Sequence, residues 1–112
     1  MNKKELQQKK MRVRSKIVGD AKRPRLSVYK SSKYIYAQII DDEKGVTIVA
    51  ASDLKTDAKL PKTKRSEDVG TVIAKLAQAQ KITKVRFDRG GFKYIGRIKS
   101  LAEAARKSGL EF

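Results

Sequence analysis

Residues 25–40 read RLSVYKSSKYIYAQII, and apolar side chains alternate with polar ones along both halves of this stretch. Leu26 and Val28 share one face of the first half, while Ile35, Ala37 and Ile39 share one face of the second. A period of two is typical of a β-strand that buries one of its faces. The polar residues between the two halves predict a turn, so the stretch forms an antiparallel pair of strands.

The pattern of the following residues predicts one more strand, a loop and a helix. After a polar turn at 41–45, the segment VTIVAAS (46–52) predicts a third strand of an antiparallel meander. Residues 53–65 show no period and contain Pro61, which indicates a loop. Ser66 is a suitable N-cap for a helix that begins there. The predicted apolar stripe of that helix consists of Val69, Val72, Ile73, Leu76 and Ala77.

The last third of the chain predicts a fourth strand and a second helix. Residues 83–88, TKVRFD, again alternate, with Val85 and Phe87 facing inward. Residues 110–112 could add a short edge strand after Gly109, which suits the end of a helix. The predicted stripe of the second helix consists of Ile95, Ile98, Leu101, Ala102 and Ala105.

The order of these elements predicts an α/β fold that borders on α+β. We expect a mixed sheet, made of the three-stranded meander and one or two further strands, with both helices packed on one face. Residues 25–112 are expected to form a single domain. Residues 1–24 contain few large apolar side chains and are predicted to be a basic extension, mobile or helical when bound to RNA.

Charge is the strongest signal in the composition. The 112 residues include 28 Lys and Arg against 12 Asp and Glu, which gives a net charge of +16. Residues 1–25 alone hold ten basic and two acidic side chains. A field of this size favours polyanionic partners. A merely solvated basic run is the alternative interpretation of the N-terminal segment.

The composition also excludes several classes of site. The chain has no cysteine and no histidine, so disulfides, thiolate metal sites and histidine general bases are absent. No apolar run approaches the roughly twenty residues of a membrane span, and no secretory signal is recognisable. We therefore expect a cytoplasmic protein with no cofactor, no metal, no small-molecule substrate and no membrane partner.

A glycine-rich stretch, FDRGGFKYIGRIK (87–99), lies between the fourth strand and the second helix. Its Gly91 and Gly96 are spaced as in a phosphate-binding loop, but Arg97 and Ile98 replace the lysine and the hydroxyl residue that such a loop requires. The glycines therefore indicate either a tight turn alone or a turn that contacts backbone phosphates. The nearby Arg89 and Lys93, together with the helix N-terminus, favour phosphate contact.

Three aspartates leave open a metal-dependent nuclease. Asp41, Asp42 and Asp88 all lie at predicted strand ends, and phosphoryl cleavage requires carboxylates that converge on a metal ion. The simpler interpretation assigns the first two to a hairpin turn and the third to a cap or a salt bridge.

The tyrosines favour RNA binding. Tyr29, Tyr34 and Tyr36 are predicted on the strand face that also carries Ser27 and Gln38, away from the helices. Lys30, Lys33 and Arg25 supply positive charge beside them. Aromatic rings, hydroxyls and cations on one sheet face suit the bases, 2′-hydroxyls and phosphates of RNA. An ordinary solvated sheet face is the alternative.

The chain resembles the bacterial family of large-subunit ribosomal protein eighteen, which binds 5S rRNA. The resemblance is carried by residues 23–52, by the helix that contains Val69 and Gly70, and by VRFDRGGFKYIGRIKSLAEAARKSGLEF (85–112). FDRGG followed by Y-x-G-R is its most specific motif. Ile95 stands where the family usually has histidine, the loop at 53–65 is shorter than usual, and a usual glycine near Lys81 is missing.

The resemblance implies a non-enzymatic structural protein of the large ribosomal subunit. It also implies that the protein binds 5S rRNA and helps attach it to 23S rRNA in the central protuberance, beside large-subunit ribosomal protein five. The RNA-binding residues expected from the chemistry above and from the family's motifs are Lys9, Lys10, Arg12, Arg14, Arg23, Arg25, Ser27, Tyr29, Lys30, Ser31, Ser32, Lys33, Tyr34, Tyr36, Arg89, Gly90, Gly91, Lys93, Tyr94 and Arg97. A nucleic-acid-binding regulator outside the ribosome is the remaining non-enzymatic alternative.

Overall fold

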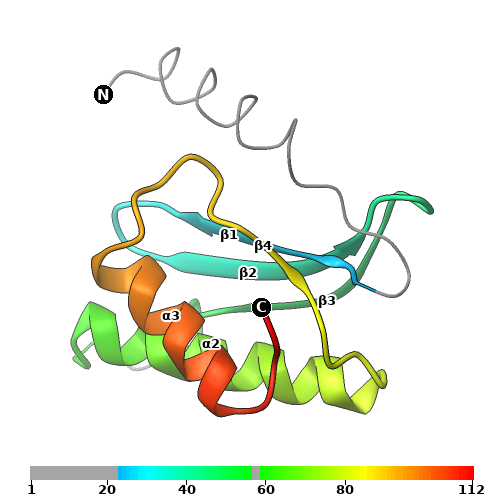
Figure 1. Ribbon diagram of the computed structural model, residues 1–112. Coiled ribbons are helices and arrows are strands. Elements are labelled where there is room, and N and C mark those ends of the chain that lie inside the picture. Colours follow the sequence, from blue (N-terminus) through cyan, green and yellow to red (C-terminus); the bar gives the residue numbers. More distant parts are fainter. Residues whose placement is uncertain (1–22, 57–58) are drawn as a thin grey trace.

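A computed structural model describes residues 23–56 and 59–112 of the protein. Within them, four strands form one sheet in the order β3-β2-β1-β4, and two helices cover one face of that sheet (Figure 1). Strand β1 pairs antiparallel with β2 and parallel with β4, so the sheet is mixed. The predicted α/β class and element order are confirmed. The elements are β1 (Arg25–Lys30), β2 (Ile35–Asp41), β3 (Val46–Ser52), α2 (Lys62–Ala79), β4 (Arg86–Asp88) and α3 (Gly96–Lys107).

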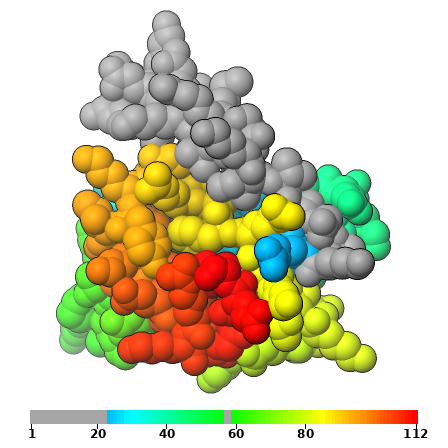
Figure 2. Space-filling model, in the orientation of Figure 1, coloured from blue at the N-terminus to red at the C-terminus, as the bar shows by residue number. Residues whose placement is uncertain are grey.

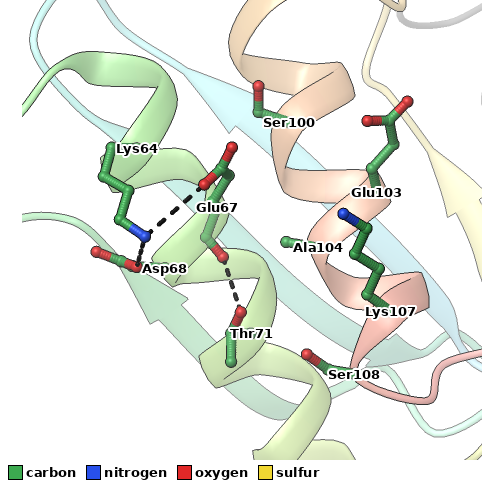
Figure 3. Close-up of a pocket in the computed structure, with 9 residues that line it drawn as sticks. All are labelled: Lys64, Glu67, Asp68, Thr71, Ser100, Glu103, Ala104, Lys107 and Ser108. Carbon is green, nitrogen blue, oxygen red and sulfur yellow. Dashed lines mark hydrogen bonds and ion pairs between the residues drawn. The ribbon is translucent and has the colours of Figure 1, made fainter.

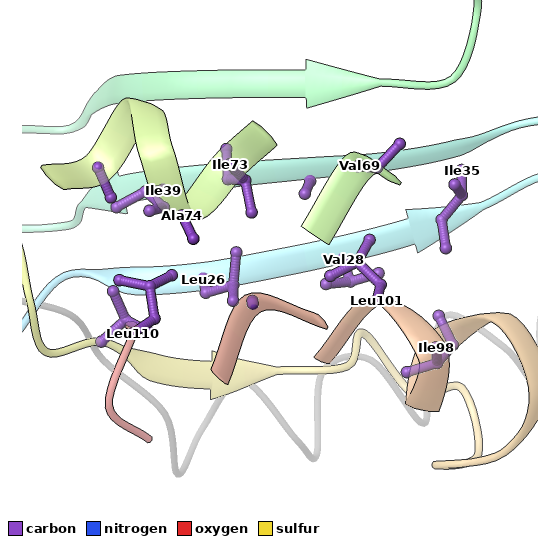
Figure 4. Packing of buried hydrophobic residues seen from close by; sticks show 14 residues of the cluster. Leu26, Val28, Ile35, Ile39, Val69, Ile73, Ala74, Ile98, Leu101 and Leu110 are labelled. Atoms are coloured by element: carbon purple, nitrogen blue, oxygen red, sulfur yellow. The ribbon is translucent and has the colours of Figure 1, made fainter. Parts of the chain in front are cut away.

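The hydrophobic core lies between the sheet and the helix pair (Figure 4). The alternation in β1 and β2 is realised as predicted, because Leu26, Val28, Ile35, Ala37 and Ile39 are fully buried on the face toward the helices. Neither α2 nor α3 covers the opposite face of the same strands (Figure 1). This asymmetry leaves one sheet face open for function.

Helix α2 begins five residues earlier than predicted. Pro61 occupies the N-cap position, and Ser66 lies inside the helix, where its hydroxyl donates to the carbonyl of Lys62 over 2.8 Å. The prediction that Ser66 caps the helix is therefore wrong. Proline is well tolerated at the start of a helix because the N–H that it lacks would be unpaired there.

The buried face of α2 is also rotated from the predicted stripe. Val72 and Leu76 are 47% and 38% exposed, whereas Gly70 and Ala74 are buried. A Cβ on Gly70 would collide with the backbone carbonyl of Leu101, so glycine permits α3 to pack closely at this point. The close approach of the two helices determines which residues of α2 are buried.

Three expectations for the last third of the chain need correction. Ile95 is not part of the stripe on α3, because it is 62% exposed and precedes the helix in an extended conformation. The predicted fourth strand is shorter, at Arg86–Asp88, although Val85 is buried as expected. The predicted edge strand at 110–112 is reduced to a single bridge, in which Lys84 pairs parallel with Glu111.

No helix among residues 23–56 and 59–112 is long and apolar enough to span a membrane.

Candidate RNA interface

The open face of β1 and β2 presents a compact set of polar and aromatic side chains. Tyr29 pairs across the strands with Tyr36, and Ser27 pairs with Gln38. The two tyrosine rings lie 6.0 Å apart. Together with Ser31, these four residues line one hollow of the surface. Cross-strand register thus assembles hydroxyl, amide and ring groups into a single patch.

The turn between β1 and β2 is held in a fixed shape at the end of this patch. The backbone N–H of Ser31 donates to the carbonyl of Tyr34 over 2.8 Å, and the N–H of Tyr34 donates to the Ser31 hydroxyl over 3.1 Å. Lys62 donates to the carbonyl of Ser32 over 2.6 Å. Ser32 and Lys33 remain exposed at the tip. The turn therefore offers a hydroxyl and a cation on a rigid backbone.

The glycine-rich loop, residues 89–95, rises on the side of the sheet away from the helices (Figure 1). Gly90 and Gly91 have φ angles of 61° and 84°, a region that glycine adopts without strain. A Cβ on Gly90 would lie 3.1 Å from the carbonyl of Val28, so the loop also approaches β1 closely. The prediction of a tight turn is confirmed, while phosphate contact remains a prediction.

Aromatic packing connects the loop to the open sheet face. The ring of Phe92 lies edge-on to Tyr29 at 5.9 Å, and the amine of Lys30 lies 5.6 Å from the same ring. Arg89 and Lys93 are exposed on the loop. In Figure 2 the yellow and orange residues of this region form one surface beside the red C-terminal residues. The loop and the sheet face thus form a continuous candidate interface.

Arg25 is placed on the predicted strand face, but its guanidinium is held inside the protein. It donates to Asp88 over 2.8 Å and to both carboxylate oxygens of Asp42 over 3.0 and 3.1 Å. Its side chain is only 11% exposed and that of Asp88 is fully buried. The hydrogen bond to Asp42, opposed by burial and assisted by Asp88, raises the pKa of Arg25 above its ordinary value. The contacts of Arg25 are therefore mainly internal.

Two further predicted site residues also have internal contacts. One guanidinium nitrogen of Arg97 donates to the carbonyl of Ser31 over 3.0 Å, so the first turn of α3 holds the β1–β2 turn in place. The ring of Tyr94 packs edge-on to Phe87, and its hydroxyl receives a hydrogen bond from Arg106 over 3.2 Å. The side chains of Arg97 and Tyr94 therefore border the candidate interface and also hold the neighbouring turn and loop in place.

The aspartates follow the simpler of the two predictions. Asp41 accepts hydrogen bonds from the N–H groups of Glu43 and Lys44 in the hairpin turn. Asp88 binds Arg25 and also accepts the N–H of Gly90 over 2.8 Å. No group of three acidic, histidine or cysteine side chains in the described part of the chain is placed to hold a metal ion.

A second hollow lies on the outer side of the helix pair (Figure 3). Lys64 approaches Glu67 and Asp68 at 3.9 and 3.7 Å, while Glu103 and Lys107 project from α3. Charges of both signs compensate one another here. The lining of this hollow therefore has no excess of positive charge, unlike the surface around the glycine-rich loop.

The structure places the remaining predicted residues as follows. Lys9, Lys10, Arg12 and Arg14 lie outside the described residues, and Arg23 is exposed just before β1. Three residues that the prediction omitted belong beside the patch: Gln38, which is exposed on β2, Phe92 in the loop, and Arg86, which is exposed and aligned with Arg25 across β1 and β4. Strand alternation already predicted Gln38 on the tyrosine face, so only its inclusion among the RNA-binding residues was missed. The place of Arg86 depends on the parallel register of β4.

The fold and charge together define a small, strongly basic α/β protein with an open sheet face and a basic loop beside it. Sequence comparison gives the family. The family described as ribosomal L18 of archaea, bacteria, mitochondria and chloroplasts matches residues 1–112. The chain therefore belongs to the ribosomal L18 family.

Curated bacterial relatives agree with this assignment. The large ribosomal subunit protein uL18 of Caldicellulosiruptor saccharolyticus is 60% identical over 106 residues, covering 90% of this chain and 86% of that protein. Those of Limosilactobacillus reuteri and Kosmotoga olearia are 56% and 57% identical, covering 95% and 99% of this chain and 91% and 96% of theirs. The family makes this chain a structural constituent of the large ribosomal subunit, located in the cytoplasmic ribosome, rather than an enzyme.

Proposed function

We propose that this protein binds 5S rRNA and helps attach it to 23S rRNA in the central protuberance, with large-subunit ribosomal protein five as a neighbour. The observation that carries the proposal is that two surfaces, the tyrosine face of the sheet and the glycine-rich loop, adjoin one another. The Tyr29–Tyr36 patch and the glycine-rich loop meet through Phe92 on the side of the sheet away from α2 and α3.

The chemistry of the patch suits structured RNA. Tyrosine rings stack on exposed bases or pack against sugars, and Ser27, Ser31 and Gln38 offer donors and acceptors to 2′-hydroxyl groups. Such a surface recognises the shape of a folded RNA rather than a duplex sequence.

The cations supply affinity. Arg89, Lys93, Lys30 and Lys33 border the patch, and the basic residues of 1–24 add to them as a separate extension ahead of the domain at 25–112. Neutralising phosphates releases counterions, so binding should weaken steeply as salt rises. The rigid turn and loop hold part of this charge in fixed positions beside the tyrosines.

Competition between 5S rRNA and tRNA at two salt concentrations tests the proposal. A preference of about a hundredfold for 5S rRNA corresponds to about 2.7 kcal/mol and requires recognition of shape. Equal binding of both RNAs, with release of both as salt rises, would leave only the counterion effect and contradict the proposal.

Variants separate the contribution of the basic extension from that of the tyrosine patch. Deleting residues 1–22 should weaken binding to both RNAs while the preference for 5S rRNA persists, because the patch stays intact. Changing both Tyr29 and Tyr36 to alanine should remove the preference instead. Lys75→Ala is a matched control, since Lys75 is exposed on α2, away from the patch, and should change neither quantity.

A further inference from the structure

The two edges of the sheet are protected very differently. Strand β4 is only three residues long, and charged Lys84, Arg86 and Arg89 lie in or beside it. Strand β3 is seven residues long, reads VTIVAAS, and contains no charge and no proline. Proteins usually protect a long edge strand with charges or proline, because its free N–H and C=O groups can pair with another chain. The β3 edge lacks both forms of protection.

Most of the exposed large apolar side chains belong to β3, α2 and the segment between them. Seven large apolar side chains of the described residues are exposed, and five of them fall in the sequence between the start of β3 and the end of α2: Val46, Leu54, Leu60, Val72 and Leu76. Exposed apolar side chains that lie together mark a contact surface more often than scattered ones do.

The course of α2 places two of these residues, Val72 and Leu76, on the side of the helix that faces β3. Near its start, Arg65 approaches Asp53 at 3.8 Å, just after β3 ends, and α2 then runs back along the sheet (Figure 1). Gly70 faces α3, so helical periodicity turns Val72 and Leu76 to the side away from α3, toward β3. Contacts between α2 and β3 agree with this placement.

A bulge shapes the edge strand. Ile39 pairs with Val49 and Ile40 with Thr47, so Ile48 is the extra residue of β3. Ile48 and Val49 both pack partly against the core, and neither is fully covered. Together with Val72 and Leu76, these residues form an apolar strip beside the free backbone of β3.

We propose that this strip and the β3 edge bind an extended, acidic segment of a partner protein, which adds a fifth strand to the sheet. Backbone pairing would satisfy the edge, and alternate apolar side chains of the segment would cover the strip. The net charge of +16 and the exposed Lys55 at the end of β3 favour acidic residues beside the added strand. Glu43 shares the opposite turn with Lys44, so the attraction is strongest at the Lys55 end.

A second copy of the chain fits this surface poorly. Two copies would each carry +16, and parallel or antiparallel pairing of two β3 strands would bring lysines from their ends together. RNA is excluded as the occupant because it cannot form the backbone ladder of a β-sheet. The inference is independent of the proposed RNA interface, which uses the tyrosine patch and the glycine loop.

The test uses the full chain and a synthetic peptide, EEVTVTVEE, at physiological salt. We expect fluorescence anisotropy to show binding, and hydrogen exchange measured by NMR to show new protection at β3 amides. A peptide with lysines in place of the glutamates should bind at least tenfold more weakly. Absence of binding, protection elsewhere, or equal binding of the lysine peptide would overturn the proposal.

Two variants separate the apolar strip from bulk charge. Leu76→Glu should weaken binding at least tenfold, because it places a carboxylate in the strip. Lys75→Glu removes more positive charge from the neighbouring exposed position, yet should weaken binding no more than about twofold where charges are screened beyond about 8 Å. Equal effects of both variants would overturn the proposal, as would concentration-dependent dimerisation of the free chain that Leu76→Glu abolishes.

Discussion

Replacement of Arg25 by methionine should destabilise the fold more than any other single loss of charge on the sheet. The change removes the guanidinium that lies 2.8 Å from the fully buried carboxylate of Asp88. Removing one partner of a buried ion pair costs about 3–5 kcal/mol, since the remaining buried charge is less well compensated. The lower end applies here, because Asp88 keeps the hydrogen bond from Gly90 and Asp42 is 25% exposed to solvent.

A loss of about 3 kcal/mol is a large part of the stability of a small domain. For a domain of about a hundred residues it should lower Tm by roughly 12–24 °C. Urea denaturation of the full chain, followed by circular dichroism, measures the same loss as a shift of the midpoint. Arg86→Met is the matched control: Arg86 is the exposed register partner of Arg25 on β4, and its loss should change stability by less than about 0.5 kcal/mol.

A double variant tests the assigned cause. In Arg25→Met with Asp88→Asn, the buried charge disappears, while the asparagine oxygen still accepts the N–H of Gly90. The double variant should therefore be more stable than Arg25→Met alone. The reasoning is refuted if Arg25→Met costs less than about 1 kcal/mol, or if the second substitution restores nothing. Because the pKa of Arg25 is raised, its guanidinium loses its proton only in strong alkali, so a change of pH within the neutral range should not alter this result.

Three further outcomes are expected. Gly70→Ala should destabilise the chain by about 1–3 kcal/mol in urea denaturation, because the added methyl collides with the Leu101 carbonyl; no change in midpoint would contradict the close helix packing. Tyr36→Ala should weaken 5S rRNA binding by about 1–3 kcal/mol without altering its salt dependence, as loss of stacking does. Lys93→Gln should reduce the slope of log affinity against log salt by about one, if its amine contacts a phosphate, while tRNA and 5S rRNA are weakened alike.

Local periodicity predicted the strands well because each of their faces meets a different environment. Leu26 and Ile39 lie under the helices and Tyr29 lies on the open face, as alternation required. The helix stripe was less predictable. A pattern of apolar residues cannot show that Gly70 admits α3 so closely that Leu76 is pushed to the edge. Periodicity also placed Ile95 in the second helix, whereas α3 starts at the next residue, Gly96.

The role of Arg25 could not be derived from its neighbours in sequence. Its strand face was predicted, and the structure places it there, but its partners lie 17 and 63 residues away in the chain. Only the parallel pairing of β4 with β1 brings Asp88 to that face. Long-range register thus decides which basic side chains bind internally and which stay available for RNA.

The same division decides which carboxylates oppose the exposed cations of this chain and which do not. Asp42 and Asp88 are held by Arg25, so they do not oppose the exposed cations Arg89 and Lys93 near the patch. The carboxylates that stay near the surface on α2 and α3 are instead paired with lysines: Glu67 and Asp68 with Lys64, and Glu103 with Lys99. The cations beside the open sheet face are thus left to attract a polyanion, although α2 and α3 together also hold eight basic against three acidic side chains. Orientation on the RNA would then follow from where the carboxylates are placed as much as from where the lysines and arginines are.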